Sequence, residues 1–360
     1  MKTSIPIERI EQLKAKKSIG LRDLAALAEV DTSTVSRALN QDPRVSEHRR
    51  KMIRQLAEEI GYRPRPLRAN RSQAIGLLIA SSRPDRPDAQ FLDRMAWLAQ
   101  RVLGERNLHV NLECVERRPS QGQTPLPAVV QQNRVDGVLV AGHPPAELIR
   151  QISELRVPVV AINDSTKRLG ISCVRSEPTP AIHQAILRLA ALGHRRFGLL
   201  MNSPEYPSSQ ARYKSYVSSL EEIGITPDPA WVVMDLAEEL KGGREGIRDL
   251  DSRGPMPSAI LCCNDWMALG ALHELQRRGL SVPGDVSLVG HDNLRFCEET
   301  EPTLTSIHRD EHGIVAKAVD LLLEQVNKGD HTPREVLVEG EMVWRESTAV
   351  APDRAAGQDK

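Results

Sequence analysis

The chain has 360 residues, more than one small hydrophobic core organises, which indicates two or three domains. Hydrophobic residues make up 40% and charged residues 27%, as in ordinary globular proteins. Aromatic residues make up only 3%, which argues against a single-strand nucleic-acid binder built on stacked rings. Lys+Arg and Asp+Glu both number 48, so the formal net charge is zero.

The zero net charge hides an uneven distribution. Residues 1–74 contain 16 Lys+Arg and 9 Asp+Glu, a net charge of +7, whereas the remaining residues carry a net charge of −7. A basic end joined to an acidic remainder is typical of a nucleic-acid-binding module attached to a second domain, although chance clustering on a solvated surface is the alternative.

The start of the chain and the cysteines bear on the compartment. Residues 1–10 alternate polar and apolar side chains and include Glu8 and Arg9, so they do not form a signal-peptide core, and no apolar run approaches a membrane span. The 5 cysteines include no C-x-x-C pair, which disfavours zinc ribbons and disulfide scaffolds. We expect a cytoplasmic protein without metal or cofactor.

Three short helices are predicted in the basic end. Apolar residues of 21–29 recur with the helical period, and Asp31 is a plausible N-cap for a helix over 32–39. A third helix is predicted from about 46 to 60, ended by Gly61. This is the helix–turn–helix layout, although a generic three-helix bundle has the same pattern.

The second of these helices carries the side chains that a DNA-reading helix needs. Short hydroxyl groups reach bases and phosphates, and a guanidinium forms a two-pronged donor that suits guanine. These groups are supplied by Thr32, Ser33, Thr34, Ser36 and Arg37.

Residues 63–73 read R-P-R-P-L-R-A-N-R-S-Q, which predicts a linker. Beyond it, short apolar runs alternate with helical patterns, which predicts parallel sheets covered by helices on both faces and divided into two similar lobes. The predicted strands are residues 75–80, 110–115, 137–141, 157–162, 197–201, 231–234, 259–262 and 286–289. The predicted helices are residues 88–104, 145–154, 179–192, 208–223, 237–251, 265–278 and 311–327.

A series of motifs in a fixed order resembles the lactose-repressor (LacI/GalR) family from about residue 18 to 348. The matching segments are GLRDLAALA (20–28), TVSRALN (34–40), RVS (44–46), IGYRP (60–64), IGLL (75–78), VDGV (135–138), LGHRR (192–196), ND (264–265), MALG (267–270), VPGDV (282–286), GHD (290–292), LTSI (304–307) and WRES (344–347).

The resemblance implies an all-α helix–turn–helix headpiece and a two-lobed α/β core like the periplasmic binding proteins. We expect an N-terminal extension (1–18), the headpiece (19–62), a hinge or linker (63–74) and an effector-binding, dimerising core (75–360). The implied protein is a transcription regulator, most often a repressor in this family, that binds a pseudo-palindromic double-stranded operator as a homodimer. A small polar effector, such as a sugar or related metabolite, would bind between the lobes.

The resemblance also assigns DNA contacts. Thr32 and Ser33 correspond to the main base-reading side chains, and Arg37 to the family's recurrent arginine. Four further residues sit where the family contacts phosphates: Thr34, Ser36, Asn40 and Ser46. Asp31 departs from the usual serine, and because an acidic group near phosphate is unhelpful, we interpret it as a helix cap.

The hinge departs more strongly from the family. Only 12 residues separate Tyr62 from Ile75, and Pro64 and Pro66 fit only near the start of a helix. Leu67 could still serve as the leucine that the family wedges between bases in the minor groove, but a plain linker is an equal alternative.

In the core, four residues match the family's effector site: Arg212, Asn264, Asp265 and Asp292. All lie at carboxyl ends of predicted strands, where open α/β sheets bind ligands. An arginine with carboxylates suits a polyhydroxylated or heterocyclic ligand. Segments 83–92 and 174–180 depart from the family's pattern, so the ligand need not be an ordinary sugar.

The sequence also permits two other interpretations. His308 to His312 reads H-R-D-E-H, a zinc-protease pattern, but Asp310 is predicted to cap a helix beginning at Glu311, which leaves His308 outside that helix. A cytosolic solute-binding protein, or a Rossmann-like enzyme, with an accessory headpiece is the alternative function. No catalytic motif supports the enzyme interpretation, so we expect no catalytic residues and no enzymatic activity.

Overall fold

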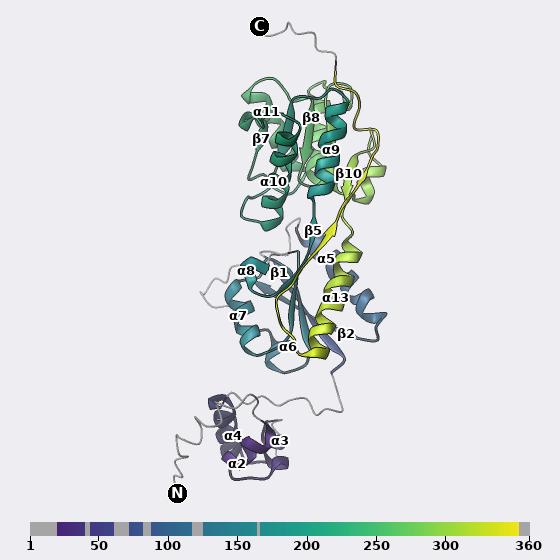
Figure 1. Ribbon diagram of the computed structural model, residues 1–360. Helices are drawn as coiled ribbons and strands as arrows, with labels where there is room; N and C mark the ends of the chain where they lie inside the picture. Colours follow the sequence, from purple (N-terminus) through teal and green to yellow (C-terminus); the bar gives the residue numbers. More distant parts are fainter. Residues whose placement is uncertain are drawn as a thin grey trace. The chain divides into compact units, whose positions relative to one another are not determined.

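The structure is a computed structural model that describes residues 20–39, 44–60, 72–81, 88–116, 125–163 and 166–352. The chain divides into two compact units, Met1–Ser72 and Gln73–Lys360 (Figure 1). Within the described residues, no helix combines the length and apolar character that a membrane span requires.

The first unit contains three helices: α2 (Leu21–Leu27), α3 (Thr32–Leu39) and α4 (Glu47–Glu59). Each helix turns one apolar stripe inward, and the fully buried side chains of Leu24, Val35 and Ile53 form the centre of this core. The predicted three-helix layout is confirmed, with α3 at its predicted bounds and the other two helices slightly shorter than predicted.

The second unit contains two lobes, each built on one six-stranded sheet. The sheet of lobe 1 has the strand order β11-β5-β4-β3-β1-β2, and every pair in it is parallel. Its strands are β1 (Ala74–Ser81), β2 (His109–Glu116), β3 (Gly137–Gly142), β4 (Val159–Ile162), β5 (Ser172–Glu177) and β11 (Glu335–Glu339).

Helices cover both faces of the lobe 1 sheet. One buried cluster joins the sheet to α5 (Asp88–Gly104) and α13 (Glu311–Lys328), which pack against each other (Figure 1). A second cluster joins the opposite face to α6 (Ala128–Gln131) and α7 (Ala146–Glu154). The short α8 (Thr166–Leu169) precedes β5. Burial on both faces explains why β3 and β4 are continuous apolar runs.

The sheet of lobe 2 has the order β12-β10-β9-β8-β6-β7, and only β12 runs antiparallel to its neighbour. Its strands are β6 (Phe197–Leu200), β7 (Val232–Val233), β8 (Ala259–Cys262), β9 (Ser287–Asp292), β10 (Thr305–His308) and β12 (Glu341–Val343). Its helices are α9 (Thr179–Ala191), α10 (Pro207–Glu222), α11 (Leu240–Arg253), α12 (Asp265–Arg277) and the 3-10 turns η1 (Pro229–Trp231) and η2 (Arg295–Glu298).

Glycines set the close approach of α11 and α12 in lobe 2. A side chain on Gly243 would collide with the Met267 carbonyl, and one on Gly270 would collide with the Leu240 carbonyl. This packing places the start of α12, which carries two of the predicted effector residues, beside the loop that leads into α11.

Three connections within the described core link the two lobes: β5 to α9, β10 to α13, and β11 to β12. The predicted α/β class with two lobes is therefore confirmed. Four strands were not predicted, namely β5, β10, β11 and β12.

Candidate functional site

The exposed face of α3 holds most of the predicted DNA contacts. Val35 and Ala38 are buried against the other headpiece helices, which turns Thr32, Ser33 and Arg37 toward solvent. Two further predicted contacts are half-buried, Thr34 and Ser36. Arg37 has no ion-pair partner within the described headpiece, so its guanidinium is available to a ligand.

Asp31 lies directly before α3 and caps it, as predicted. Its Oδ1 accepts a hydrogen bond from the Thr34 backbone N–H at 2.8 Å. The hydroxyl of Ser33 also donates to Oδ1, at 2.5 Å, and the hydroxyl of Thr34 donates to Oδ2, at 2.7 Å. The hydroxyl protons of two predicted DNA contacts are therefore already engaged by a carboxylate.

The remaining predicted DNA contacts divide into two groups. Ser46 is exposed at the N-cap position of α4, and its side chain makes no capping hydrogen bond. Asn40 and Leu67 lie outside the described residues.

The core contains a cavity of about 460 Å³ between its two lobes. Lobe 1 lines it with side chains that include Arg94, His143 and Asn163, and lobe 2 lines it mainly from the loops that follow β6, β7, β8 and β9. The cavity thus lies at the carboxyl ends of the strands, as the predicted effector site does. Three of the four predicted effector residues line it: Arg212, Asn264 and Asp292.

Arg212 comes from α10 and is only 8% exposed. Its Nη1 donates to the Cys263 carbonyl oxygen at 2.6 Å, and its Nη2 lies 3.9 Å from Asp292 Oδ1. This carbonyl satisfies one N–H group of the guanidinium. A buried cation without a hydrogen-bond acceptor would be strongly unfavourable. Arg212 also lines the cavity.

Asp292 ends β9 with a backbone φ of 109°, a region that residues other than glycine rarely adopt. Its Oδ1 lies 3.0 Å from His291 Nδ1 and 3.3 Å from Arg309 Nη2. Burial raises the pKa of Asp292, but the Arg309 guanidinium and His291 outweigh burial, so the pKa lies well below its ordinary value. Asp292 is therefore an anion that can only accept hydrogen bonds.

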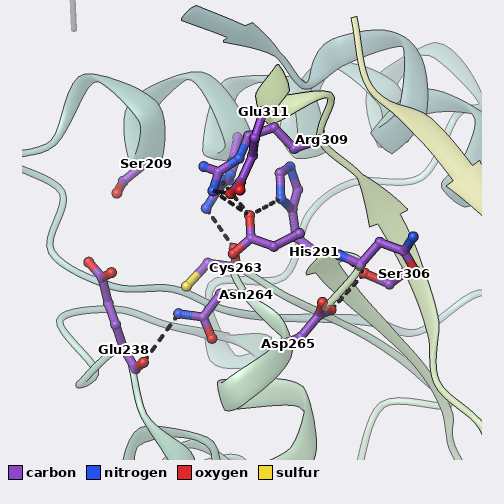
Figure 2. Close-up of polar contacts among 12 residues, drawn as sticks. Ser209, Glu238, Cys263, Asn264, Asp265, His291, Ser306, Arg309 and Glu311 are labelled. Atoms are coloured by element: carbon purple, nitrogen blue, oxygen red, sulfur yellow. Dashed lines mark hydrogen bonds and ion pairs between the residues drawn. The ribbon is translucent and has the colours of Figure 1, made fainter. Parts of the chain in front are cut away.

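Asn264 is the N-cap of α12. Its Oδ1 accepts from the Met267 backbone N–H at 2.7 Å, and its Nδ2 lies 3.4 Å from the backbone oxygen of Glu238 (Figure 2). Hydrogen bonds also hold the neighbouring lining of lobe 2: Asn202 accepts from Ser209 and donates to the Glu238 carboxylate, both at 2.6 Å.

Asp265 is fully buried and does not line the cavity. Its Oδ1 accepts from the Ser306 hydroxyl at 2.6 Å and its Oδ2 from the Leu294 backbone N–H at 2.7 Å (Figure 2). Burial, assisted by the nearby Asp292, raises the pKa of Asp265 to about 7. The carboxyl group ties α12 to the segment that follows β9.

Sequence reasoning missed an ion-pair chain beside the cavity. Glu311 accepts from Arg94 Nε and Nη2, both at 2.9 Å, and from Arg309 Nη2 at 2.8 Å. Arg309 also reaches Asp292, so the chain runs from α5 in lobe 1 to β9 in lobe 2. Arg309 follows the carboxyl end of β10. A prediction of that strand would have identified Arg309 as a candidate site residue, because ligands bind at the carboxyl ends of strands.

The H-R-D-E-H segment is divided between two elements. His308 ends β10, whereas His312 lies in α13, whose N-cap is Asp310. The Asp310 carboxylate accepts from the Gly313 backbone N–H at 2.7 Å. The predicted helix cap is confirmed, and the two histidines do not share a helical face.

Comparisons with known proteins agree with both parts of the chain. The profile of the lacI family of bacterial regulatory proteins matches residues 20–65, and that of the periplasmic binding protein-like domain matches residues 186–348. The transcriptional repressor CytR of Escherichia coli (strain K12) is 30% identical over 350 residues, which cover 94% of this chain and 100% of CytR.

Two further similarities cover most of the chain. The transcriptional repressor PurR of Pasteurella multocida is 26% identical over 333 residues, covering 91% of this chain and 98% of PurR. The crystal structure of a LacI family transcriptional regulator from Mycobacterium smegmatis is 25% identical with a TM-score of 0.65, and covers 77% of this chain and 99% of that structure. Because the 30% identity to CytR spans nearly the whole of both proteins, the chain belongs to the LacI family of bacterial regulatory proteins.

Proposed function

We propose that this LacI-family regulator is a cytoplasmic transcriptional repressor that binds a pseudo-palindromic operator as a homodimer. The observation that carries the proposal is the exposed polar face of α3, which lies within the segment matched by the family profile. We assign DNA binding to residues 19–62, a linker to residues 63–74, and effector binding and dimerisation to residues 75–360. The named relatives are repressors, which supports regulation and not catalysis as the role of the chain.

At the operator, Thr32 and Ser33 read bases, and the Arg37 guanidinium donates two parallel hydrogen bonds to a guanine. Phosphates are contacted by Thr34, Ser36, Asn40 and Ser46. Leu67 is either a minor-groove wedge or part of a plain linker, and the shortness of residues 63–74 supports the linker as much as the wedge.

The effector is a small polar metabolite, such as a sugar or a related compound, that binds in the cavity. Arg212 donates to paired ligand oxygens, Asp292 accepts from hydroxyl or ring N–H groups, and Asn264 adds an amide. Asp265 supports the site from behind, because its carboxyl group faces Ser306 and not the cavity. Binding shifts the balance between open and closed lobes, and this shift alters operator affinity.

The homodimer requires an apolar surface outside the cavity. Trp97 on α5 is 60% exposed and Leu112 on the edge strand β2 is 55% exposed, and these two elements pack against each other. Large exposed apolar side chains on two neighbouring elements support burial of this part of lobe 1 by a second copy of the chain.

Footprinting tests the proposal. The purified protein is tested on the DNA upstream of its own gene, with and without a panel of sugars, nucleosides and related metabolites. We expect a protected site with two related half-sites, and one class of metabolite that changes the protection. Protein that binds this DNA no better than random DNA at any metabolite concentration would contradict the proposal.

A further inference from the structure

Asp31 is an acidic residue at the place where a DNA-reading helix begins. It is exposed, directly precedes α3, and adjoins the two side chains assigned to base reading, Thr32 and Ser33. In helix–turn–helix proteins the N-terminal residues of the second helix contact base edges in the major groove. A carboxylate at this point is repelled by phosphates, so it weakens binding unless it meets a hydrogen-bond donor on the DNA.

The Asp31 carboxylate is held in one orientation. Three donors from Ser33 and Thr34 contact it at 2.5 to 2.8 Å, two on Oδ1 and one on Oδ2. These bonds, first among them that from the Ser33 hydroxyl, hold the pKa of Asp31 well below its ordinary value, so the group is ionised and only accepts. A carboxylate offers about four acceptor positions, so the three bonds leave one available.

We propose that Asp31 reads a cytosine in each operator half-site by accepting a hydrogen bond from its N4 amino group. Among the four bases, guanine and thymine present acceptors in the major groove, which repel a carboxylate. Adenine presents a donor beside the acceptor N7, whereas cytosine presents its amino donor without a neighbouring acceptor on the same base. The inference rests on the proposed DNA-binding function and adds a base preference to it.

The same geometry changes the roles of Ser33 and Thr34. Because their hydroxyl protons are donated to Asp31, these hydroxyls meet DNA as acceptors through their free lone pairs. For Thr34 this replaces the phosphate contact assigned above, since phosphate oxygens only accept hydrogen bonds. The three residues therefore act as one acceptor surface at the start of α3. Such a surface favours the amino-bearing bases over the carbonyl-bearing ones.

A cap alone would explain the hydrogen bonds within the headpiece, so the test must separate capping from reading. Serine caps helices about as well as aspartate, which makes Asp31→Ser the informative variant. Asp31→Asn keeps the shape and removes the charge. Glu58→Gln, at an exposed position on α4, is the matched control for the loss of one negative charge in the headpiece.

The experiment selects binding sites from randomised DNA with the full-length protein and each variant, followed by sequencing and titration of single sites. For the wild type we expect a cytosine at one position of each half-site, and about tenfold weaker binding when that C·G pair is replaced by T·A. For Asp31→Ser we expect the two sites to bind equally, with the preferences at all other positions unchanged. Glu58→Gln should keep the cytosine preference.

Two results would overturn the inference while leaving DNA binding in place. Asp31→Ser with the same preferences as the wild type, or with a uniform loss at every position, would reduce Asp31 to a helix cap. Thermal unfolding monitored by circular dichroism shows whether α3 remains folded in the variants. A wild type that selects no sequence at all would instead contradict the proposed function itself.

Discussion

The headpiece and the core hold their polar groups in opposite environments. On α3 the side chains of Thr32, Ser33 and Arg37 are exposed, in a region whose sequence carries a net charge of +7. In the cavity, Arg212 is 8% and Arg309 6% exposed, and both lie against the carboxylate of Asp292. We therefore expect solvent screening to govern ligand binding at α3, and the pairing of buried charges to govern it in the cavity.

The contrast extends to a single residue type. Asp31 is exposed, and hydrogen bonds from Ser33 and Thr34 keep its pKa well below its ordinary value. Asp265 is fully buried, and burial raises its pKa to about 7. The strength of an exposed polar network therefore depends on screening by ions and water. The strength of a buried network depends on how its groups pair, because a buried group that loses its partner is not rehydrated.

The largest expected difference between the two sites is in how their binding affinities depend on salt concentration. Neutralising several phosphates releases bound counterions, so operator affinity should fall by about a thousandfold or more between roughly 50 and 200 mM salt. Effector affinity should change by less than about threefold, because buried charges are weakly screened. Fluorescence anisotropy with labelled operator and calorimetry with the effector measure the two. A flat operator response would contradict DNA binding through the headpiece.

Arg212→Ala and Asp292→Ala should nearly abolish the effector response. Losing one partner of a buried charged hydrogen bond costs on the order of 2–5 kcal/mol, about thirtyfold to several thousandfold in affinity. Operator binding without effector should stay close to wild type, because the DNA contacts belong to another unit of the chain. Arg295→Ala, at a side chain 92% exposed in the same lobe, is the control. Normal responses in both variants would show that the ligand binds elsewhere.

Arg37→Ala should cost about 1–3 kcal/mol on the cognate operator and much less on random DNA, since a two-pronged contact to guanine discriminates between bases. Competition titrations with both DNAs measure the difference. Equal losses on the two DNAs would make Arg37 a phosphate contact.

The smallest expected effect is the dependence of core stability on pH. Because the folded-state pKa of Asp265 is raised from 3.8 to about 7, the folded core binds the extra proton between these values, and stability falls as pH rises through this window. Asp265→Asn removes this contribution, so the difference in unfolding free energy between wild type and variant should change by about 1 kcal/mol from pH 5 to pH 6. A constant difference across this range would mean that Asp265 is ionised at both pH values.

Local sequence patterns predicted the elements whose bounds depend on residues close together in the sequence. The bounds of α3 follow from the Asp31 cap and the apolar stripe of Val35 and Ala38, all within eight residues of one another. The strands β11 and β12 lie at sheet edges, where burial is partial and sequences such as E-V-L-V-E and E-M-V carry little apolar signal. Their existence depends on partners far away in the sequence.

The same distinction applies to the cavity. Arg212, Asn264 and Asp292 each follow or face a strand end that the sequence reveals, and the structure brings them to one cavity. The pairing of Arg94 with Glu311 joins residues 217 positions apart, and no local pattern records it. The Asp265 carboxyl group likewise faces away from the cavity because it bonds Ser306, which lies on the unpredicted strand β10.

The order in which the strands are added has a consequence for biosynthesis. The lobe 1 sheet gains its last strand, β11, only after all of α9 to α13 has been made, and the lobe 2 sheet gains β12 immediately afterwards (Figure 1). In a nascent chain leaving the ribosome, one edge of β5 and one edge of β10 thus stay unpaired until β11 and β12 emerge, so neither sheet is complete before the other is nearly complete. A chain that ends before residue 335 would lack both β11 and β12 and so leave both sheets incomplete, a substrate for chaperones or proteases instead of a partly active regulator.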